Sequence, residues 1–142
     1  MLFPAAVLIM VALAAMAVDS SIAFLAQREL ANATAAAAND AATLAVSDSA
    51  FYERNRIELS AAAVESVAVD RVLSLVDQAR HHGLAVEAEA QPPAGPGCGW
   101  TVRVSASSQV DELFARTIPG GTGRVDVRAT SSAVPGQDAS VC

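Results

Sequence analysis

The chain has 142 residues and a formal net charge of −6 at pH 7; 53% of its residues are hydrophobic, but only 4% are aromatic. All nine basic residues are arginine, and the sequence pI is about 4.7, so the chain offers no basic footprint for nucleic acid. The length predicts one small unit rather than several large domains. Abundant alanine and scarce aromatic residues exclude a large aromatic-rich enzyme core.

The first 18 residues contain no charged or strongly polar side chain, and apolar residues resume after residues 19–21 and run to about Ala26. An 18-residue helix covers ~27 Å at ~1.5 Å per residue, close to the ~30 Å hydrocarbon core of a bilayer. Pro4 falls in the first turn, where a missing N–H costs little. The pattern predicts a membrane-spanning helix, with lipid as its partner.

A cleaved secretory signal is the alternative interpretation of this segment. Ala15 and Ala17 form a small-x-small site before Val18. A chain cut there would be a secreted or membrane-anchored extracytoplasmic binding module. We favour a retained span, because no arginine precedes the apolar stretch and more apolar helix follows the site. The first cation is Arg28, so charge alone does not set the orientation of the span.

Asp19 is the first charge in the apolar stretch. A carboxylate inside a membrane helix is costly and is usually kept for a partner or a function. Two hypotheses stay open: Asp19 marks the membrane interface, or it pairs with a cation of a neighbouring subunit when spans pack side by side.

Residues 27–46 contain no Gly or Pro and many alanines, so we expect one helix to continue from the span. Ala33, Ala37, Ala41 and Ala45 recur every four residues and form a small-residue stripe on one face. Such a stripe permits close helix approach. It serves either as an assembly contact with other subunits or as the face on which the helix lies on its own domain.

Residues 17–45 resemble the N-terminal signature of the TadE/TadG-like proteins of tight adherence (Flp) pilus systems. In that family an apolar span ends in Ala-Val-Asp and leads through an Arg or Gln into an Ala-rich helix. The matching residues here are Ala17, Val18 and Asp19, then Gln27 and Arg28, then Leu30, Asn32, Ala33, Ala36 and Ala37. The sequence departs from pilin-type precursors in having no short basic leader and no Glu at the fifth position of a mature chain.

The resemblance implies a pilin-like minor or accessory subunit of a bacterial surface pilus or of its assembly apparatus. Such a subunit would cross the cytoplasmic membrane once, with its C-terminal domain outside, and would act by lateral helix packing or be incorporated in an extracellular pilus. Its implied partners are other pilin-like subunits and the assembly machinery, namely platform proteins and, indirectly, a secretion ATPase.

The sequence predicts an α+β fold, with a membrane and assembly helix over residues 1–46 and a small outward-facing head over residues 47–142. A second helix is expected from near Arg56, with Asn55 and Glu58 as a capping box and Gly83 as its C-cap. Phe51 and Tyr52 are expected to plug the connection before it. His81 and His82 then adjoin the helix end, in a geometry that suits a metal poorly.

The remaining chain alternates apolar and polar residues over 86–90, 100–106 and 125–129, which predicts three strands of an antiparallel sheet. A Pro/Gly loop over 91–99 joins the first two strands, and residues 110–118 are expected to form a short helix before a turn over 119–123. Glu89 and Arg103 are candidates for a pair across the polar face. The helix-plus-sheet layout is similar to a pilin head.

Cys98 and Cys142 are the two cysteines, and in an exported domain they predict one disulfide. The alternative is two free thiols on a cytoplasmic face. No phosphate-binding loop, metal-ligand set or nucleophile with a matching base stands out. We therefore expect neither an enzyme nor a cofactor or metal site.

Overall fold

The computed structural model describes residues 3–48, 51–52, 57–95, 99–117 and 123–136. Its elements are α1 (Phe3–Leu44), α3 (Ala61–Leu75), β1 (His81–Gln91), β2 (Thr101–Asp111), the single 3₁₀ turn η1 (Ala115–Thr117) and β3 (Arg124–Ala133). The expected α+β order of a long apolar helix, a second helix and a three-stranded antiparallel sheet is confirmed. Cys98 and Cys142 lie outside the described residues, and so does the disulfide predicted between them.

Helix α1 is continuous for 42 residues, as the run of alanines without Gly or interior Pro predicts. It ends where the chain turns into a short extended pairing with the segment before α3. Val46 and Leu59 form an antiparallel bridge, and Ser60 N–H donates to the carbonyl of Ala45 at 3.0 Å. This pairing brings α3 back alongside α1.

The expected end of the second helix is wrong, and the helix begins later than expected; Asn55 and Arg56, on which the expected start rests, lie outside the described residues. Ser60 is the N-cap of α3 and accepts from the N–H of Ala63, while Glu58 lies in the extended segment before it. At the other end, Asp77 forms an Asx turn by accepting from Ala79 N–H at 3.1 Å. The turn stops the helix well before Gly83 and starts β1 at His81.

Gly83 instead lies in β1, with a φ of +61° at an irregularity in the pairing of β1 with β2. A glycine in this left-handed conformation is typical of a bulge. His81 and His82 consequently lie on a strand and not at a helix terminus. Elsewhere in the register Glu89 is directly opposite Arg103, and its carboxylate accepts from Gln91 Nε2 at 3.2 Å; the ion pair of Glu89 with Arg103 stays a prediction.

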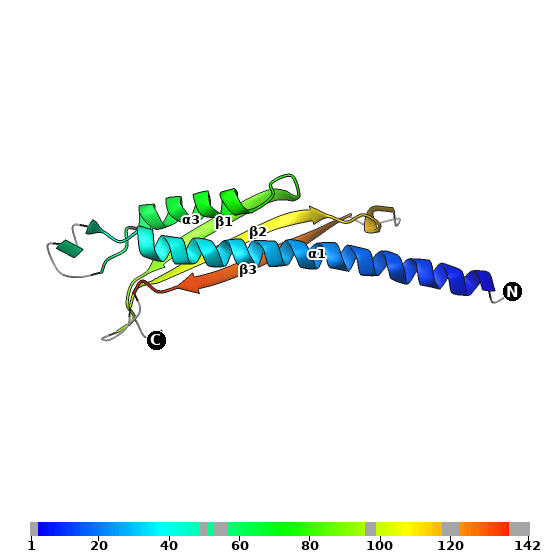
Figure 1. The fold of residues 1–142 in the computed structure, drawn as a ribbon, viewed down its shortest axis with the longest axis horizontal. Helices are drawn as coiled ribbons and strands as arrows, with labels where there is room; N and C mark the ends of the chain where they lie inside the picture. The colour runs from blue at the N-terminus through cyan, green and yellow to red at the C-terminus, as the bar shows by residue number, and fades with distance from the viewer. Residues whose placement is uncertain (1–2, 49–50, 53–56, 96–98, 118–122, 137–142) are drawn as a thin grey trace.

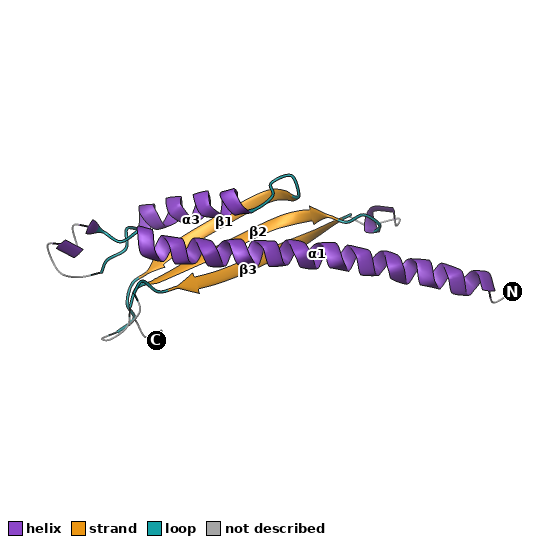
Figure 2. Ribbon diagram, viewed as in Figure 1, coloured by secondary structure: helices purple, strands orange, loops and turns teal. Residues whose placement is uncertain are grey.

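The three strands form a sheet of order β1-β2-β3, and both helices lie on one of its faces (Figures 1 and 2). Helix α3 packs over β1 and α1 packs over β2 and β3. Along β2, buried Val102, Val104, Ala106, Ser108 and Val110 alternate with residues of the uncovered, polar face. The expected helix at 110–118 is wrong, because β2 runs on to Asp111 and only η1 follows.

Small residues dominate the core between the layers. Its buried members are Ala26, Leu30, Ala33, Ala37, Ala38, Ala41, Ala42 and Ala45 of α1 and its end, Leu59, Val64, Ala68, Val72 and Val76 around α3, and Val102, Val104, Ala106, Val110 and Val127 of the sheet. The Ala33, Ala37, Ala41 and Ala45 stripe is at most 2% exposed. The prediction that these four alanines contact other subunits is therefore wrong, and the alternative holds: the helix lies on its own domain.

The expected division at residues 46 and 47 is also wrong, because the second half of α1 belongs to the head core. We use "stalk" for residues 3–18 of α1, which extend beyond the sheet, and "head" for the rest of the described chain (Figure 1). Phe51 and Tyr52 do not plug the head core. Their rings pack edge to face with centroids 5.4 Å apart, and the two residues are 47% and 81% exposed.

Replacing Ala37 by leucine should lower the free energy of unfolding by about 1–3 kcal/mol, because extra methyl groups do not fit between α1 and the layers packed on it. Denaturant unfolding of the detergent-solubilised protein measures the change. Ala35→Leu is the matched control, since Ala35 is exposed on the same helix. Equal stability of the two variants would contradict the buried stripe.

Candidate functional site

The carboxylate of Asp19 lies at the junction of stalk and head and binds the backbone of the loop after β2. Its Oδ1 accepts from the N–H of Leu113 at 2.9 Å and of Phe114 at 3.1 Å. Its Oδ2 accepts from Phe114 at 3.2 Å and from Ala115 at 2.8 Å. Three successive amides thus bind one buried carboxylate, in a residue that is only 7% exposed. We call the Asp19 carboxylate and the amides of residues 113–115 the Asp19 clamp.

The described partners of Asp19 are backbone amides of its own chain, so its carboxylate is satisfied without a neighbouring subunit; that Asp19 also pairs with a cation of such a subunit stays a prediction. The amides lie 94 to 96 residues away in sequence. Backbone amides carry no sequence signature, so the partner could not be named in advance. The available signal was an isolated carboxylate in an apolar helix, which demands a strong donor set.

The base of this loop is held by a side-chain cluster that joins all three strands. Arg124 Nε donates to Asp111 Oδ1 at 3.0 Å, and His82 Nε2 lies 3.1 Å from Asp111 Oδ2. The Arg124 guanidinium, followed by His82, lowers the pKa of the exposed Asp111 carboxyl below its usual value, and partial desolvation opposes this shift. Glu112 N–H donates to the Gly123 carbonyl at 2.9 Å and closes the loop.

Gly123 is required by the close approach of this loop to η1. Its φ is +65°, and a Cβ at this position would lie 2.5 Å from the Cβ of Arg116. Any larger residue would push η1 away and move the amides that face Asp19. The turn predicted over residues 119–123 is otherwise outside the described residues.

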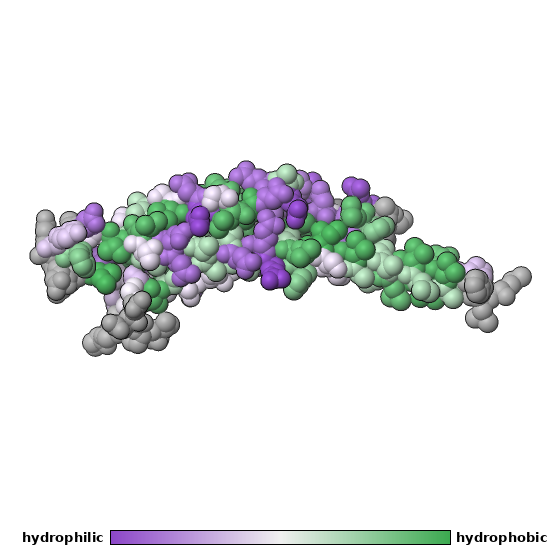
Figure 3. Space-filling view, viewed as in Figure 1, coloured by the Kyte–Doolittle hydropathy of each residue, from purple (hydrophilic) through white to green (hydrophobic). Residues whose placement is uncertain are grey.

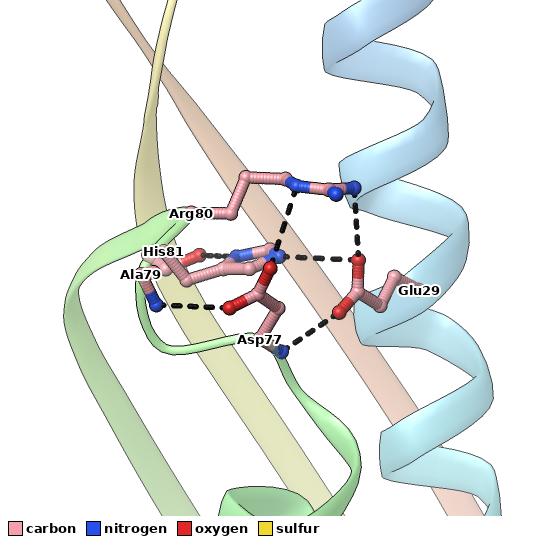
Figure 4. A network of polar contacts seen from close by, with 6 residues as sticks. Glu29, Asp77, Ala79, Arg80 and His81 are labelled. Atoms are coloured by element: carbon pink, nitrogen blue, oxygen red, sulfur yellow. Dashed lines mark hydrogen bonds and ion pairs between the residues drawn. The ribbon is translucent and has the colours of Figure 1, made fainter.

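A second polar cluster joins α1 to the segment between α3 and β1 (Figure 4). Glu29 of α1 accepts from Asp77 N–H at 2.8 Å, and its other oxygen lies 3.8 Å from both Arg80 Nη1 and His81 Nε2. The fully buried His81 ring also bonds to Ser108 of β2 through Nδ1 at 2.7 Å. The cluster fixes the rotation of α1 over the sheet, because a turned helix would leave Glu29 without these partners.

The stalk carries a continuous apolar surface that the rest of the described chain leaves uncovered (Figure 3). Its exposed large side chains are Val7, Leu8, Ile9, Met10, Val11, Leu13, Met16 and Val18. The most apolar 18-residue window of α1 has a mean hydropathy of 2.2 and is only 6% buried. Helix α1 is therefore long and apolar enough to cross a membrane, and this window is not the core helix of a soluble fold.

Within the described residues no cluster of three or more His, Cys, Asp or Glu side chains is placed to hold a metal ion. The described fold has two helices over one face of a three-stranded antiparallel sheet, and α1 extends beyond the sheet as an exposed apolar stalk. No protein-family model, curated protein or solved structure matches the chain.

Asp19→Asn should loosen the loop without unfolding the head, because an amide presents only one acceptor to three donors. Hydrogen bonds to a charged group contribute about 1.5–3 kcal/mol, so we expect roughly 10- to 100-fold faster exchange of the amides at residues 113–115. Hydrogen exchange measured by mass spectrometry checks this. Asp48→Asn is the control, since Asp48 is exposed just after α1; equal exchange in both variants would refute the clamp.

Arg124→Gln should raise the pKa of Asp111 toward its ordinary value of 3.8, since it removes the largest cause of the lowered pKa. A carboxyl group whose pKa is lower in the folded than in the unfolded chain stabilises the fold at pH values above its unfolded pKa. This stabilisation is lost as the pH falls through its folded pKa. The variant should therefore lose less stability than wild type below pH 3.8. Carboxyl NMR titration measures the shift, with Arg128→Gln as the control.

Proposed function

We propose that the chain is a membrane-anchored, pilin-like subunit of the TadE/TadG-like type, a minor or accessory component of a bacterial Tad (Flp) pilus or of its assembly apparatus. The stalk would cross the cytoplasmic membrane once and the head would lie outside. The observation that carries this proposal is the apolar surface of residues 4–18, most of which the other described residues leave exposed. The signature at residues 17–45 and the helix-over-sheet head support the pilus assignment.

Lateral packing in this proposal uses the stalk and not the alanine stripe, because the stripe is buried in the head. Stalks of neighbouring subunits, or the membrane helices of platform proteins, would cover side chains such as Met10 and Leu13, which are 71% and 61% exposed. A secretion ATPase would act only through such membrane partners. The head would contribute shape and a polar surface, with no catalytic role.

A secreted binding module is the second candidate, and one observation favours it. The stalk ends at Val18, next to the small-x-small site before it, and the hydrophobic core begins beyond Asp19, at Ala26. Cleavage after Ala17 would leave the core and the Asp19 clamp in place. N-terminal sequencing of the mature protein separates the two functions.

A double substitution in the stalk, Ile9→Asp with Leu13→Asp, should release the protein from membranes. Each carboxylate at the centre of a span costs about 2.5–3.5 kcal/mol, whereas the matched pair Leu44→Asp with Leu75→Asp alters exposed leucines of the head. Carbonate extraction of cell membranes should leave wild type and the control pair in the pellet. A soluble wild-type protein that begins at Val18 would establish the secreted module instead.

The pilus role is tested in cells of the native host with a photo-crosslinking residue at Leu13, and with the same residue at Leu44 as the control. We expect Leu13 to give adducts with pilin-like subunits or platform proteins, and Leu44 to give none. Wild-type protein retained in membranes without any adduct at Leu13 would support a membrane anchor that does not assemble.

A further inference from the structure

The loop after β2 presents two large apolar side chains beside the stalk. Leu113 and Phe114 are 51% and 43% exposed, although the loop backbone is held tightly by Asp19. An open groove of about 570 Å³ lies between this loop and the stalk, next to the contact at Asp19. Its lining is mostly apolar and comes from stalk residues together with the loop: Leu8, Val11, Ala12, Ala15, Met16, Asp19, Ser20, Glu112, Phe114 and Ala115.

The loop lies on the membrane side of the point where the apolar surface of α1 ends. Phe24 and Leu25 are 66% and 57% exposed, and they are followed by the polar sequence of residues 27–29. Leu25 is six residues beyond Asp19, or about 9 Å along the helix axis. If the membrane boundary follows the apolar surface of α1, then Asp19 and the loop bound to it lie about 9 Å inside it, within the ~5–10 Å depth of interfacial segments.

The backbone N–H groups of the loop at residues 113–115 already have hydrogen-bond acceptors within the protein, as a membrane environment requires. An unsatisfied amide in a bilayer costs several kcal/mol. The N–H groups of Leu113, Phe114 and Ala115 all donate to the Asp19 carboxylate. The same bonds satisfy the carboxylate, so one contact removes the polar penalty of both partners. Arg116 is exposed two residues after Phe114, and its guanidinium is suited to the phosphates of lipid headgroups.

We propose that Leu113 and Phe114 form a second membrane contact, in which these two side chains insert into the lipid interface beside the stalk. This inference rests on the proposed membrane anchoring. The groove and the side chains of Leu113 and Phe114 are continuous with the apolar surface of the stalk. This continuity favours lipid over another protein as the occupant of the groove. Contacts at the stalk and at the loop hold the head at a defined tilt and rotation on the bilayer, whereas a single helix would leave it free to swivel.

Tryptophan fluorescence of the full-length protein in phosphatidylcholine vesicles tests the inference. The chain has one tryptophan, Trp100, at the far end of the 11-residue strand β2, about 35 Å from the loop. The probe is Phe114→Trp in a Trp100→Phe background, and the wild-type chain is the control. Should Trp100→Phe impair folding, Phe114→Trp is made with Trp100 retained and the wild-type emission is subtracted.

Lipids brominated near the headgroup end of the acyl chain should lower the emission of the Trp at 114 roughly twofold, as expected for a depth of ~5–10 Å, and should leave Trp100 unchanged. Quenching by aqueous iodide alone would overturn the proposal. Quenching by neither agent, with cross-linked dimers in the vesicles, would assign the groove to a second copy and also overturn it. Flotation of the same vesicles is read first: protein that fails to float refutes the membrane anchor itself, whereas protein that floats without lipid quenching refutes only the loop contact.

Discussion

The whole architecture depends on one helix that packs on one of its faces with side chains no larger than alanine over most of its contact length. Ala33, Ala37 and Ala41 let the backbone of α1 approach α3 and the sheet closely, and valines from those layers fill the space between them. A core of alanine and valine is thin, so buried area accumulates along the length of the helix and not in one aromatic cluster. This explains how a chain with 4% aromatic residues builds a head at all.

The same helix passes from one environment to another at Asp19. On the head side its inner face is buried by protein, and on the stalk side its apolar residues have no cover within the described chain. The Asp19 carboxylate joins the stalk side to the head side of the helix. It binds the amides of residues 113–115, in the loop after β2, at the point where α1 extends beyond the sheet. Glu29 and its partners Asp77 and His81 provide a second fixed point further along. The polar contacts of Asp19 and Glu29, together with the buried alanine stripe, define the position of α1 over the sheet.

This arrangement separates the surfaces available to partners. The alanine stripe is buried within the head and the uncovered face of the sheet is polar, whereas the stalk and the loop residues Leu113 and Phe114 carry exposed apolar side chains. Assembly by helix packing, as proposed, would therefore involve the stalk. The clamp at Asp19 would then serve assembly indirectly, since it sets the direction in which the head leaves the membrane.

The sequence by itself determined the elements whose causes are local. An alanine-rich run without Gly or Pro predicts α1, and the alternation around Val86, Val102 and Val127 predicts three strands, because helix and strand periodicities are encoded within a few residues. The start of α3 was misplaced because Asn55 and Glu58 form a capping-box pattern, whereas the pairing of Val46 with Leu59 keeps the chain extended there and Ser60 becomes the N-cap.

Only the tertiary structure decided which surface covers the alanine stripe and which groups bind Asp19. A small-residue face and an isolated carboxylate have the same sequence pattern whether their partner belongs to the same chain or to another. The partner amides at residues 113–115 have no side-chain signature and lie more than 90 residues away. Burial partners are long-range consequences of packing, so local propensity reveals the need for a partner but not its identity.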